Sequence, residues 1–229
     1  MSLFNPAVAA CPNCATERSF QLVASVNAAR RPDLRAKILD GTFQRETCDN
    51  CGAQFVPQPA LTYLDVKRGD WILVEPAEYQ ENWKRFGTVA REAFERAYGP
   101  RTSPAAQELG QGLRARVVFG WAALREKLRC HDLGIDDVEL ELLKMAVVRR
   151  VSGTPLADDN ELRLLDANAG ELFLCWLSAA TEQVIATVPV PRARYDEIVA
   201  DTEHWQSLRA EIASHPFVDM NRMLLGAAD

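Results

Sequence analysis

Alternating apolar and polar positions predict several short strands in the first 75 residues. The run FQLVASVNA at residues 20–28 alternates with the period of two that is typical of a strand. Further strands are predicted at residues 42–47, 53–56, 61–66 and 71–74. A short helix is expected over residues 32–39, because Pro32 suits the first helical turn and Gly41 follows the end. Together these elements predict a small antiparallel sheet with one helix.

The middle of the chain has a helical pattern. Over residues 76–98, apolar side chains recur at steps of three and four: Tyr79, Trp83, Phe86, Ala90, Phe94 and Ala97. We interpret this stripe as a packing surface rather than a ligand site. Two more helices are predicted at residues 121–131 and 136–148. Residues 113–119 are either a strand or the start of one continuous helix that reaches residue 131.

The last third returns to a strand pattern. Strands are predicted at residues 161–165, 171–177 and 183–188, with short turns between them. Helices are expected at residues 191–203 and 205–212. A three-stranded antiparallel meander covered by helices is a small α+β unit, so we predict the α+β fold class for the chain.

Charge is distributed unevenly and supports a division into three parts. Residues 1–75 carry no net charge, residues 76–150 carry +2 and residues 151–229 carry −8. We therefore expect a sheet unit at 1–75, a helical segment packing on it at 76–150, and an acidic α+β unit at 151–229. This distribution does not favour electrostatic binding to nucleic acid or to anionic lipid.

Overall composition is that of an ordinary globular protein. Of 229 residues, 48% are hydrophobic and 25% are charged, which excludes a disordered chain. No apolar run approaches the roughly 18 residues that span a bilayer. The first ten residues, MSLFNPAVAA, lack the basic and apolar regions of a signal peptide. We expect a cytoplasmic protein without a membrane partner.

Four of the six cysteines are spaced as two pairs. Each pair has the form C-x2-C, in which a tight turn brings two thiolates to one face, and two such turns complete a tetrahedron around zinc. Pro12 presets the first turn, and Gly52 allows a positive φ after the second. The predicted metal ligands are Cys11, Cys14, Cys48 and Cys51, and the predicted cofactor is one structural Zn²⁺.

Other readings of these cysteines are weaker. Disulfides are disfavoured in a reducing cytosol, and a bridge within a C-x2-C pair is strained. A thioredoxin-like site uses a single pair at the start of a helix, which neither pair has here. Four cysteines alone do not distinguish zinc from an iron–sulfur cluster. A complete set of four ligands argues against catalytic zinc, which keeps one position open.

The remaining reactive residues do not form a recognisable catalytic set. Cys130 and Cys175 lie in apolar runs and are expected in the core, with His131 at a helix end. His204 and His215 are expected at the surface or in turns. The acidic pairs at 136–137 and 158–159 are expected at a helix start and in a loop. Motifs of zinc proteases, serine hydrolases and nucleotide-binding loops are absent from the sequence, so no catalytic residue is predicted.

The order of these elements resembles a known family. A CPNC knuckle is followed by a strand, a Pro-Asp helix that ends in Gly, a second strand, CDNCG and the segment LTYLD at residues 61–65. Together with VVFGWAALREKLRC at 117–130 and ELELLK at 139–144, this order is similar to the CpXC family of bacterial proteins. The resemblance covers roughly residues 8–150 and implies a zinc-ribbon fold, with no implied reaction. It carries over the four paired cysteines.

These observations favour a non-enzymatic zinc-ribbon protein that acts as an adaptor for an unidentified protein partner. The first alternative is a transcriptional regulator that binds nucleic acid through the ribbon, whose 33-residue insertion contains several basic residues. These are Arg30, Arg31, Arg35, Lys37 and Arg45, with acidic residues among them. The second alternative is an enzyme of unknown reaction in the middle or C-terminal part.

Overall fold

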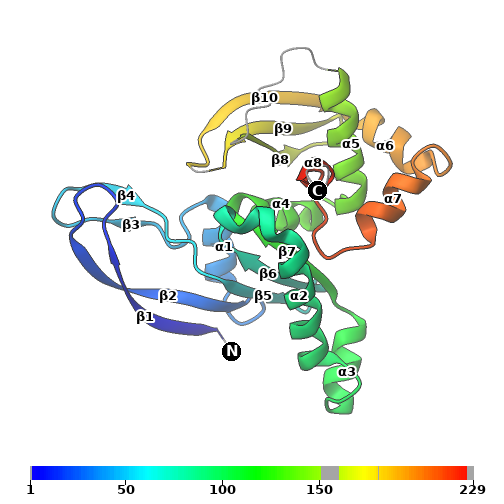
Figure 1. Ribbon diagram of the computed structural model, residues 1–229. Coiled ribbons are helices and arrows are strands. Elements are labelled where there is room, and N and C mark those ends of the chain that lie inside the picture. The colour runs from blue at the N-terminus through cyan, green and yellow to red at the C-terminus, as the bar shows by residue number, and fades with distance from the viewer. Residues whose placement is uncertain (1, 151–159, 180, 226–229) are drawn as a thin grey trace.

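The computed structural model describes residues 2–150, 160–179 and 181–225, and a five-stranded mixed sheet forms its first layer (Figure 1). Its strands, in spatial order, are β1 (Leu3–Ala10), β2 (Glu17–Asn27), β5 (Leu61–Asp65), β6 (Asp70–Glu75) and β7 (Arg114–Phe119). β1 pairs with β2, and β5 with β6, in antiparallel fashion. β2 pairs with β5, and β6 with β7, in parallel. All six residues of β6 are buried, as expected for a strand with neighbours on both sides.

Helices cover both faces of this sheet. On one face, α1 (Pro32–Asp40) and α4 (Gly120–Asp132) pack their apolar side chains against β2, β5 and β6. On the other face, α2 (Trp83–Tyr98) buries its aromatic stripe against β6 and β7, and α3 (Pro104–Gln111) packs on α2. The stripe predicted over residues 76–98 is therefore a packing surface.

A second sheet lies on the far side of α4. It is antiparallel, in the order β10 (Val184–Pro191), β9 (Glu171–Ser178) and β8 (Asn160–Ala167). The helices α5 (Asp137–Arg150), α6 (Arg192–Ala200) and α7 (Gln206–Ala213) share its core, and α8 (Asn221–Leu225) follows them. The α+β class and the C-terminal three-stranded meander with helices are confirmed.

Several elements differ from the predictions. β1 was not predicted, and the parallel pairs make the first sheet mixed. The strand predicted at 42–47 is only β3 (Glu46–Thr47), because residues 41–45 form the turn that ends α1, and it pairs with β4 (Gln54–Phe55). The helix predicted from residue 76 begins with a 3₁₀ turn, Ala77–Asn82. Residues 114–119 are a strand, so the continuous helix to residue 131 is wrong.

The C-terminal segment, residues 216–220, returns to the first sheet. The amide of Val117 in β7 donates to the carbonyl of Pro216 at 3.1 Å. Phe217 is 1% exposed and lies edge-on to Phe119 with ring centroids 5.1 Å apart. The division at residues 75 and 150 stays a prediction, although β7 and this segment join elements from different parts.

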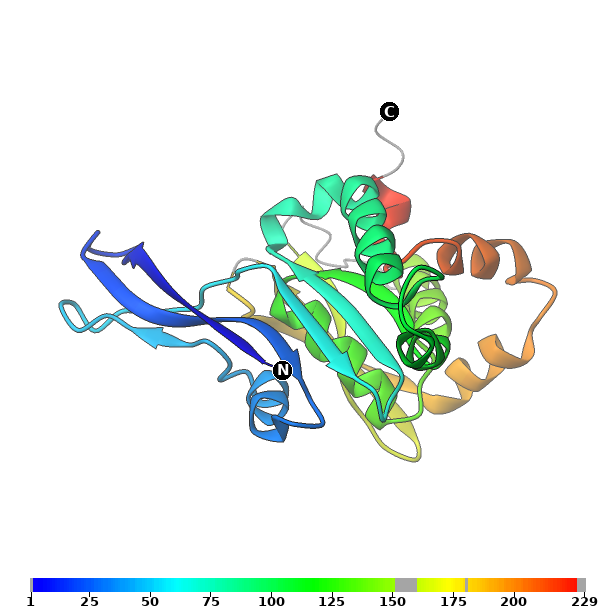
Figure 2. The same cartoon turned by 90° about the horizontal axis from the view of Figure 1, so that it is seen from below.

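Helix α4 lies between the two sheets (Figure 2). It buries charged side chains. Glu126 of α4 is fully buried and accepts hydrogen bonds from Lys144 of α5 at 2.7 Å and from Arg163 of β8 at 3.1 Å. Lys144 also donates to Glu141 at 2.9 Å, and Arg163 to Asp219 at 2.6 Å. Burial alone would raise the pKa of Glu126, but Lys144 and Arg163 hold it below its usual value. This buried ionic network joins α4, α5, β8 and the C-terminal segment.

No helix within the described ranges has the length and apolar character needed to cross a membrane.

We predict that Lys144→Met lowers the free energy of unfolding by about 3–5 kcal/mol, because it leaves Glu126 and Glu141 buried without their shared cation. Urea unfolding measures the change. Arg194→Met is the control, since it removes an exposed ion pair with Glu197 and should change the free energy by no more than about 1 kcal/mol. Equal effects of the two substitutions would contradict the assignment of the network as a stabilising centre.

Candidate metal centre

The paired cysteines lie at the end of an arm that extends from the rest of the molecule (Figure 2). We define the arm as residues 3–22 and 45–56, which contain the outer part of the β1–β2 hairpin and the β3–β4 hairpin. Cys11 and Cys14 lie in the turn between β1 and β2, and Cys48 and Cys51 in the turn between β3 and β4. Each turn contributes two of the four sulfurs.

The two turns have the same backbone arrangement. In the first, the amide of Ala15 donates to the carbonyl of Cys11 at 2.9 Å, and the amide of Cys11 donates to the carbonyl of Thr16 at 2.9 Å. In the second, the amide of Gly52 donates to the carbonyl of Cys48 at 2.8 Å, and the amide of Cys48 donates to the carbonyl of Ala53 at 2.9 Å. Both turns are therefore C-x2-C loops of the same type, closed by equivalent hydrogen bonds.

A residue with positive φ follows the second cysteine of each turn. Gly52 has φ of 72°, as its position after Cys51 predicted, and Ala15 occupies the equivalent place with φ of 57°. Glycine adopts this conformation without a steric penalty, whereas alanine carries a Cβ that opposes it. The first turn is thus strained in a way that the second is not.

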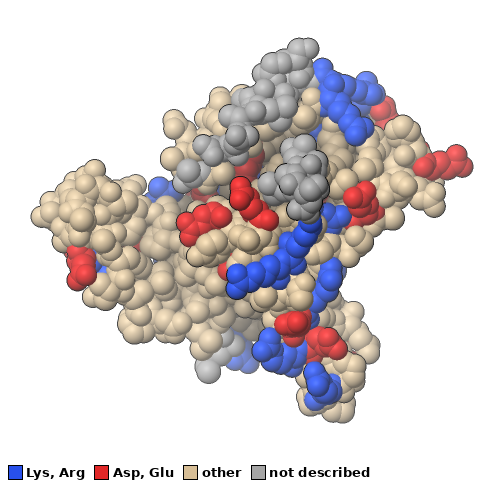
Figure 3. All heavy atoms as spheres, viewed as in Figure 1, with Lys and Arg blue, Asp and Glu red and all other residues tan. Residues whose placement is uncertain are grey.

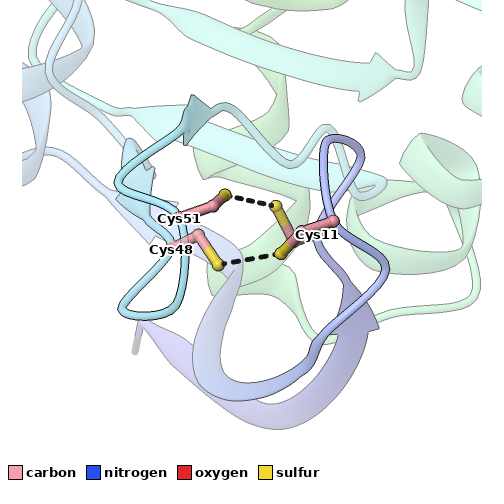
Figure 4. A group of neighbouring side chains, drawn as sticks. Cys11, Cys48 and Cys51 are labelled. Atoms are coloured by element: carbon pink, nitrogen blue, oxygen red, sulfur yellow. Dashed lines mark hydrogen bonds between the residues drawn. The ribbon is translucent and has the colours of Figure 1, made fainter.

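The four sulfurs converge on one point (Figure 4). Sγ of Cys11 is 3.7 Å from Sγ of Cys51, and Sγ of Cys14 is 3.6 Å from Sγ of Cys48. All four sulfurs lie within 4.8 Å of one another, and none forms a disulfide. A tetrahedron with metal–sulfur bonds of about 2.3 Å has edges of about 3.8 Å. The cysteines therefore lie close enough together to bind one metal ion.

Neighbouring polar groups favour thiolates at part of this site. Sγ of Cys14 is 3.3 Å from the Thr16 hydroxyl, and the Asn50 amide donates to it at 3.6 Å. These hydrogen bonds, that of Thr16 foremost, lower the pKa of Cys14 to about 5. Burial raises the pKa of Cys11 to about 11. A divalent cation would lower the pKa of every ligand, because it binds the thiolate and not the thiol.

Two contacts hold the hairpins of the arm together besides the sulfurs. Arg18 of β2 forms an ion pair with Asp49 at 2.8 Å and donates to the carbonyl of Thr47. Phe20 of β2 lies edge-on to Phe55 of β4, with ring centroids 6.3 Å apart. These contacts bring the second turn against the first, so the spacing of the cysteines is set by both hairpins.

The single cysteines lie where the sequence predicted. Cys130 is 2% exposed and Cys175 is 1% exposed, each within the apolar core and outside the four-sulfur cluster. Burial raises the pKa of both thiols. Asp136 begins α5 as expected, since its carboxylate accepts from the amide of Val138 at 2.8 Å. The acidic pair at residues 158–159 lies outside the described residues.

Two positions lie where the sequence predicted but are more buried than expected. His215 is in the bend that follows α7, as predicted for a turn residue, and it is half-buried, with its ring 4.8 Å from that of Trp83 and against Gly87. Burial lowers its pKa to about 4. Asp137 is the first residue of α5, as predicted, and it is buried between Arg116 and Lys127, at 2.8 and 3.2 Å.

A polar cluster around LTYLD went unnoticed in the sequence. Asp65 and Asp70 lie opposite each other on β5 and β6, and both are buried. His131 at the end of α4 has Nδ1 3.5 Å from Asp70, and Arg68 has a guanidinium nitrogen 3.1 Å from Asp65. In the sequence, the only sign of this cluster is that two aspartates, five residues apart, flank the turn between β5 and β6. Aspartates that are exposed at a turn have the same spacing, so the sequence does not reveal that these two are buried.

We predict that Ala15→Gly stabilises the metal-loaded arm by about 0.5–1 kcal/mol, because it relieves the positive φ of the first turn. Gly52→Ala should destabilise the arm by about 1 kcal/mol, because alanine is strained at the positive φ of this residue. A clash would not contribute, since no atom lies within 4 Å of the added Cβ. Chemical denaturation at one fixed concentration of free zinc measures both. Changes of the same sign would show that the two turns do not share this conformation.

Comparison with known proteins gives a match to the family described as CpXC protein, over residues 9–144. No curated protein and no solved structure matches the chain. The matched region contains both cysteine turns, the last two residues of β1, the other four strands of the first sheet, α1 to α4 and the first half of α5. It ends before the second sheet. A match over more than half of the 229 residues, which includes all four converging cysteines, shows that the chain belongs to the CpXC family.

Proposed function

We propose that the four thiolates bind one Zn²⁺ in a closed structural site. The observation that carries this proposal is the convergence of the four sulfurs within 4.8 Å, with the shortest separations close to a tetrahedral edge. Four soft sulfur ligands in two knuckle turns suit zinc, and they leave no position open for a catalytic water. A reducing cytoplasm would keep these thiols available for the metal.

The metal would replace the hydrophobic core that the arm lacks. Seven of the eight residues of β1 are exposed, and β3 and β4 have two residues each. The buried residues of the arm are Cys11 and Cys48. A unit this small does not bury enough apolar surface to fold alone, so a structural metal supplies folding free energy directly.

The function that we propose is a non-enzymatic adaptor that presents the arm to another protein. β1 is an edge strand, and Leu3, Phe4 and Val8 on it are 53%, 43% and 64% exposed. An exposed edge strand with apolar side chains can accept a further strand from a partner, through backbone hydrogen bonds and side-chain contacts. This surface supports a protein partner over the alternatives.

Nucleic-acid binding through the ribbon has weaker support. Arg18, Arg31 and Arg35 each form an ion pair with an aspartate, at 2.8, 2.6 and 2.7 Å. Paired guanidinium groups contribute less to phosphate binding than free ones. Retention on heparin that falls steeply with salt would favour the nucleic-acid alternative instead of the adaptor.

We predict one zinc ion per chain in protein purified without added metal, measured by inductively coupled plasma mass spectrometry. Cys14→Ser and Cys48→Ser should each reduce the zinc content by at least about tenfold, because each removes one of four ligands. Cys175→Ser is the control, since this thiol lies in the core away from the cluster. Iron in place of zinc, or full zinc content in both ligand variants, would contradict the proposed site.

We predict that the adaptor captures its partner through β1. Phe4→Lys combined with Val8→Lys should abolish capture from a host lysate in an affinity pull-down, because it places charges on the exposed edge. Val184→Lys with Ile185→Lys is the matched control, since β10 is the other exposed apolar edge strand and lies in the second sheet. Capture that survives the β1 changes, or that is lost equally with both pairs, would exclude β1 as the binding surface.

A further inference from the structure

A cavity of about 320 Å³ lies between α5 and α6, away from the cysteine turns. On each helix the lining residues lie three, four and seven positions after the first one, so they form one continuous stripe along the helix. The two stripes are the walls of the cavity. From α5 these residues run from Leu143 to Arg150, and from α6 and the residue that follows it they run from Arg194 to Asp201. We name this space the α5–α6 cavity. Its volume is in the range of pockets that bind small molecules.

The inner surface of the α5–α6 cavity is apolar and built on buried side chains. Leu143, Ile198 and Trp205 line it and are 1%, 6% and 9% exposed. Ala146 and Val147 of α5 complete the wall and are half-buried. Because these side chains belong to the core of the second sheet, the inner surface is preformed and rigid. An apolar occupant would gain contact with a tryptophan ring and aliphatic groups without rearranging them.

The mouth of the α5–α6 cavity is polar, and its charges are unequally compensated. Arg194 is paired with Glu197 at 2.8 Å, and the Asp201 carboxylate accepts from the amide of His204 at 2.9 Å. Arg150, at the C-terminal end of α5, forms no ion pair with an acidic side chain in the part of the chain that the structure describes. It is exposed, and Figure 3 shows basic side chains gathered at this end of α5. Among the described residues, Arg150 is therefore the charged group at the mouth that has neither an ion-pair nor a hydrogen-bond partner.

We propose that the α5–α6 cavity binds a small amphiphilic carboxylate, with its apolar body against Leu143, Ile198 and Trp205 and its carboxylate on Arg150. A guanidinium group binds a carboxylate through two parallel hydrogen bonds, which fixes the orientation of the ligand. A cationic amphiphile would bring like charge to Arg150, and a neutral one would leave its donors unpaired. The inference concerns the C-terminal unit and does not depend on the metal site.

The occupant is a small molecule, because the wall stripes lie on two helices that already pack against each other. A partner helix would need a long open groove along both helices, whereas the space here has the volume of a small-molecule pocket, about 320 Å³. One apolar chain or ring system with a single head group fits the apolar lining and the one guanidinium at the mouth that has no partner among the described residues.

Isothermal titration calorimetry with sodium decanoate tests the proposal on the full-length protein. We expect saturable binding of one decanoate per chain. Decanol and decyltrimethylammonium, with the same chain length, should bind at least about tenfold more weakly, because they lack the charge that pairs with Arg150. No saturable binding of decanoate, or equal affinity for all three compounds, would overturn the proposal.

Variants identify the site without relying on a single substitution. Arg150→Gln should weaken decanoate binding about tenfold and leave decanol unchanged, whereas Arg149→Gln, the exposed neighbour outside the cavity, should leave decanoate unchanged. Ala146→Phe should abolish binding by filling the cavity, with the melting temperature confirming that the variant folds. Arg150→Glu, which adds no bulk, should reverse the preference towards decyltrimethylammonium. Equal effects at 149 and 150, or an unchanged preference in Arg150→Glu, would show adsorption elsewhere on the surface and overturn the assignment.

Discussion

A helix buried on both sides must have a partner for every charge that it carries. α4 is in this position, and its Glu126 receives Lys144 from α5, Arg163 from β8 and the amide of Leu164. An ionised carboxylate without these donors would be strongly destabilising at such a site. The two sheets are therefore joined through directional contacts as well as apolar packing, and directional contacts fix how each layer sits on the helix. Glu126 thereby connects α4, which lies on the first sheet, to α5 and to β8 of the second sheet.

The arm, in contrast, is held together with little burial of side chains. Its strands bury few side chains, and its two hairpins meet through four sulfurs, one ion pair, one aromatic contact and the hydrogen bonds of Arg18 and Asn50. The insertion between the turns contains α1, whose Leu34 and Ile38 are buried in the core of the first sheet. The second turn therefore reaches the first with its position already restricted by α1. This restriction lowers the entropic cost of bringing distant cysteines together.

Local sequence patterns predict many of the helices and strands. The elements that they do not predict have physical reasons for lacking such a pattern. The helix at 32–39, the hairpin around residues 67–70 and the final meander have clear periodicity and turn residues, and the structure contains them. β1 has neither, because almost all its residues face solvent and no alternation is required. Parallel pairing, as between β6 and β7, joins segments about forty residues apart and has no local signature.

The functional and buried polar residues were also predicted only in part. The four paired cysteines are a fixed-spacing motif, so their convergence could be anticipated from short-range sequence alone. Glu126 and Lys144 were not noticed, because isolated charges on a helix usually face water, and burial becomes visible only when the second sheet is in place. The return of residues 216–220 adds a consequence for biosynthesis. A ribosome releases the amino end first, so the hydrophobic site beside Phe119 that receives Phe217 stays empty until residues 216–220 have emerged. A nascent chain would expose this site to chaperones from the emergence of Phe119 until that of Phe217.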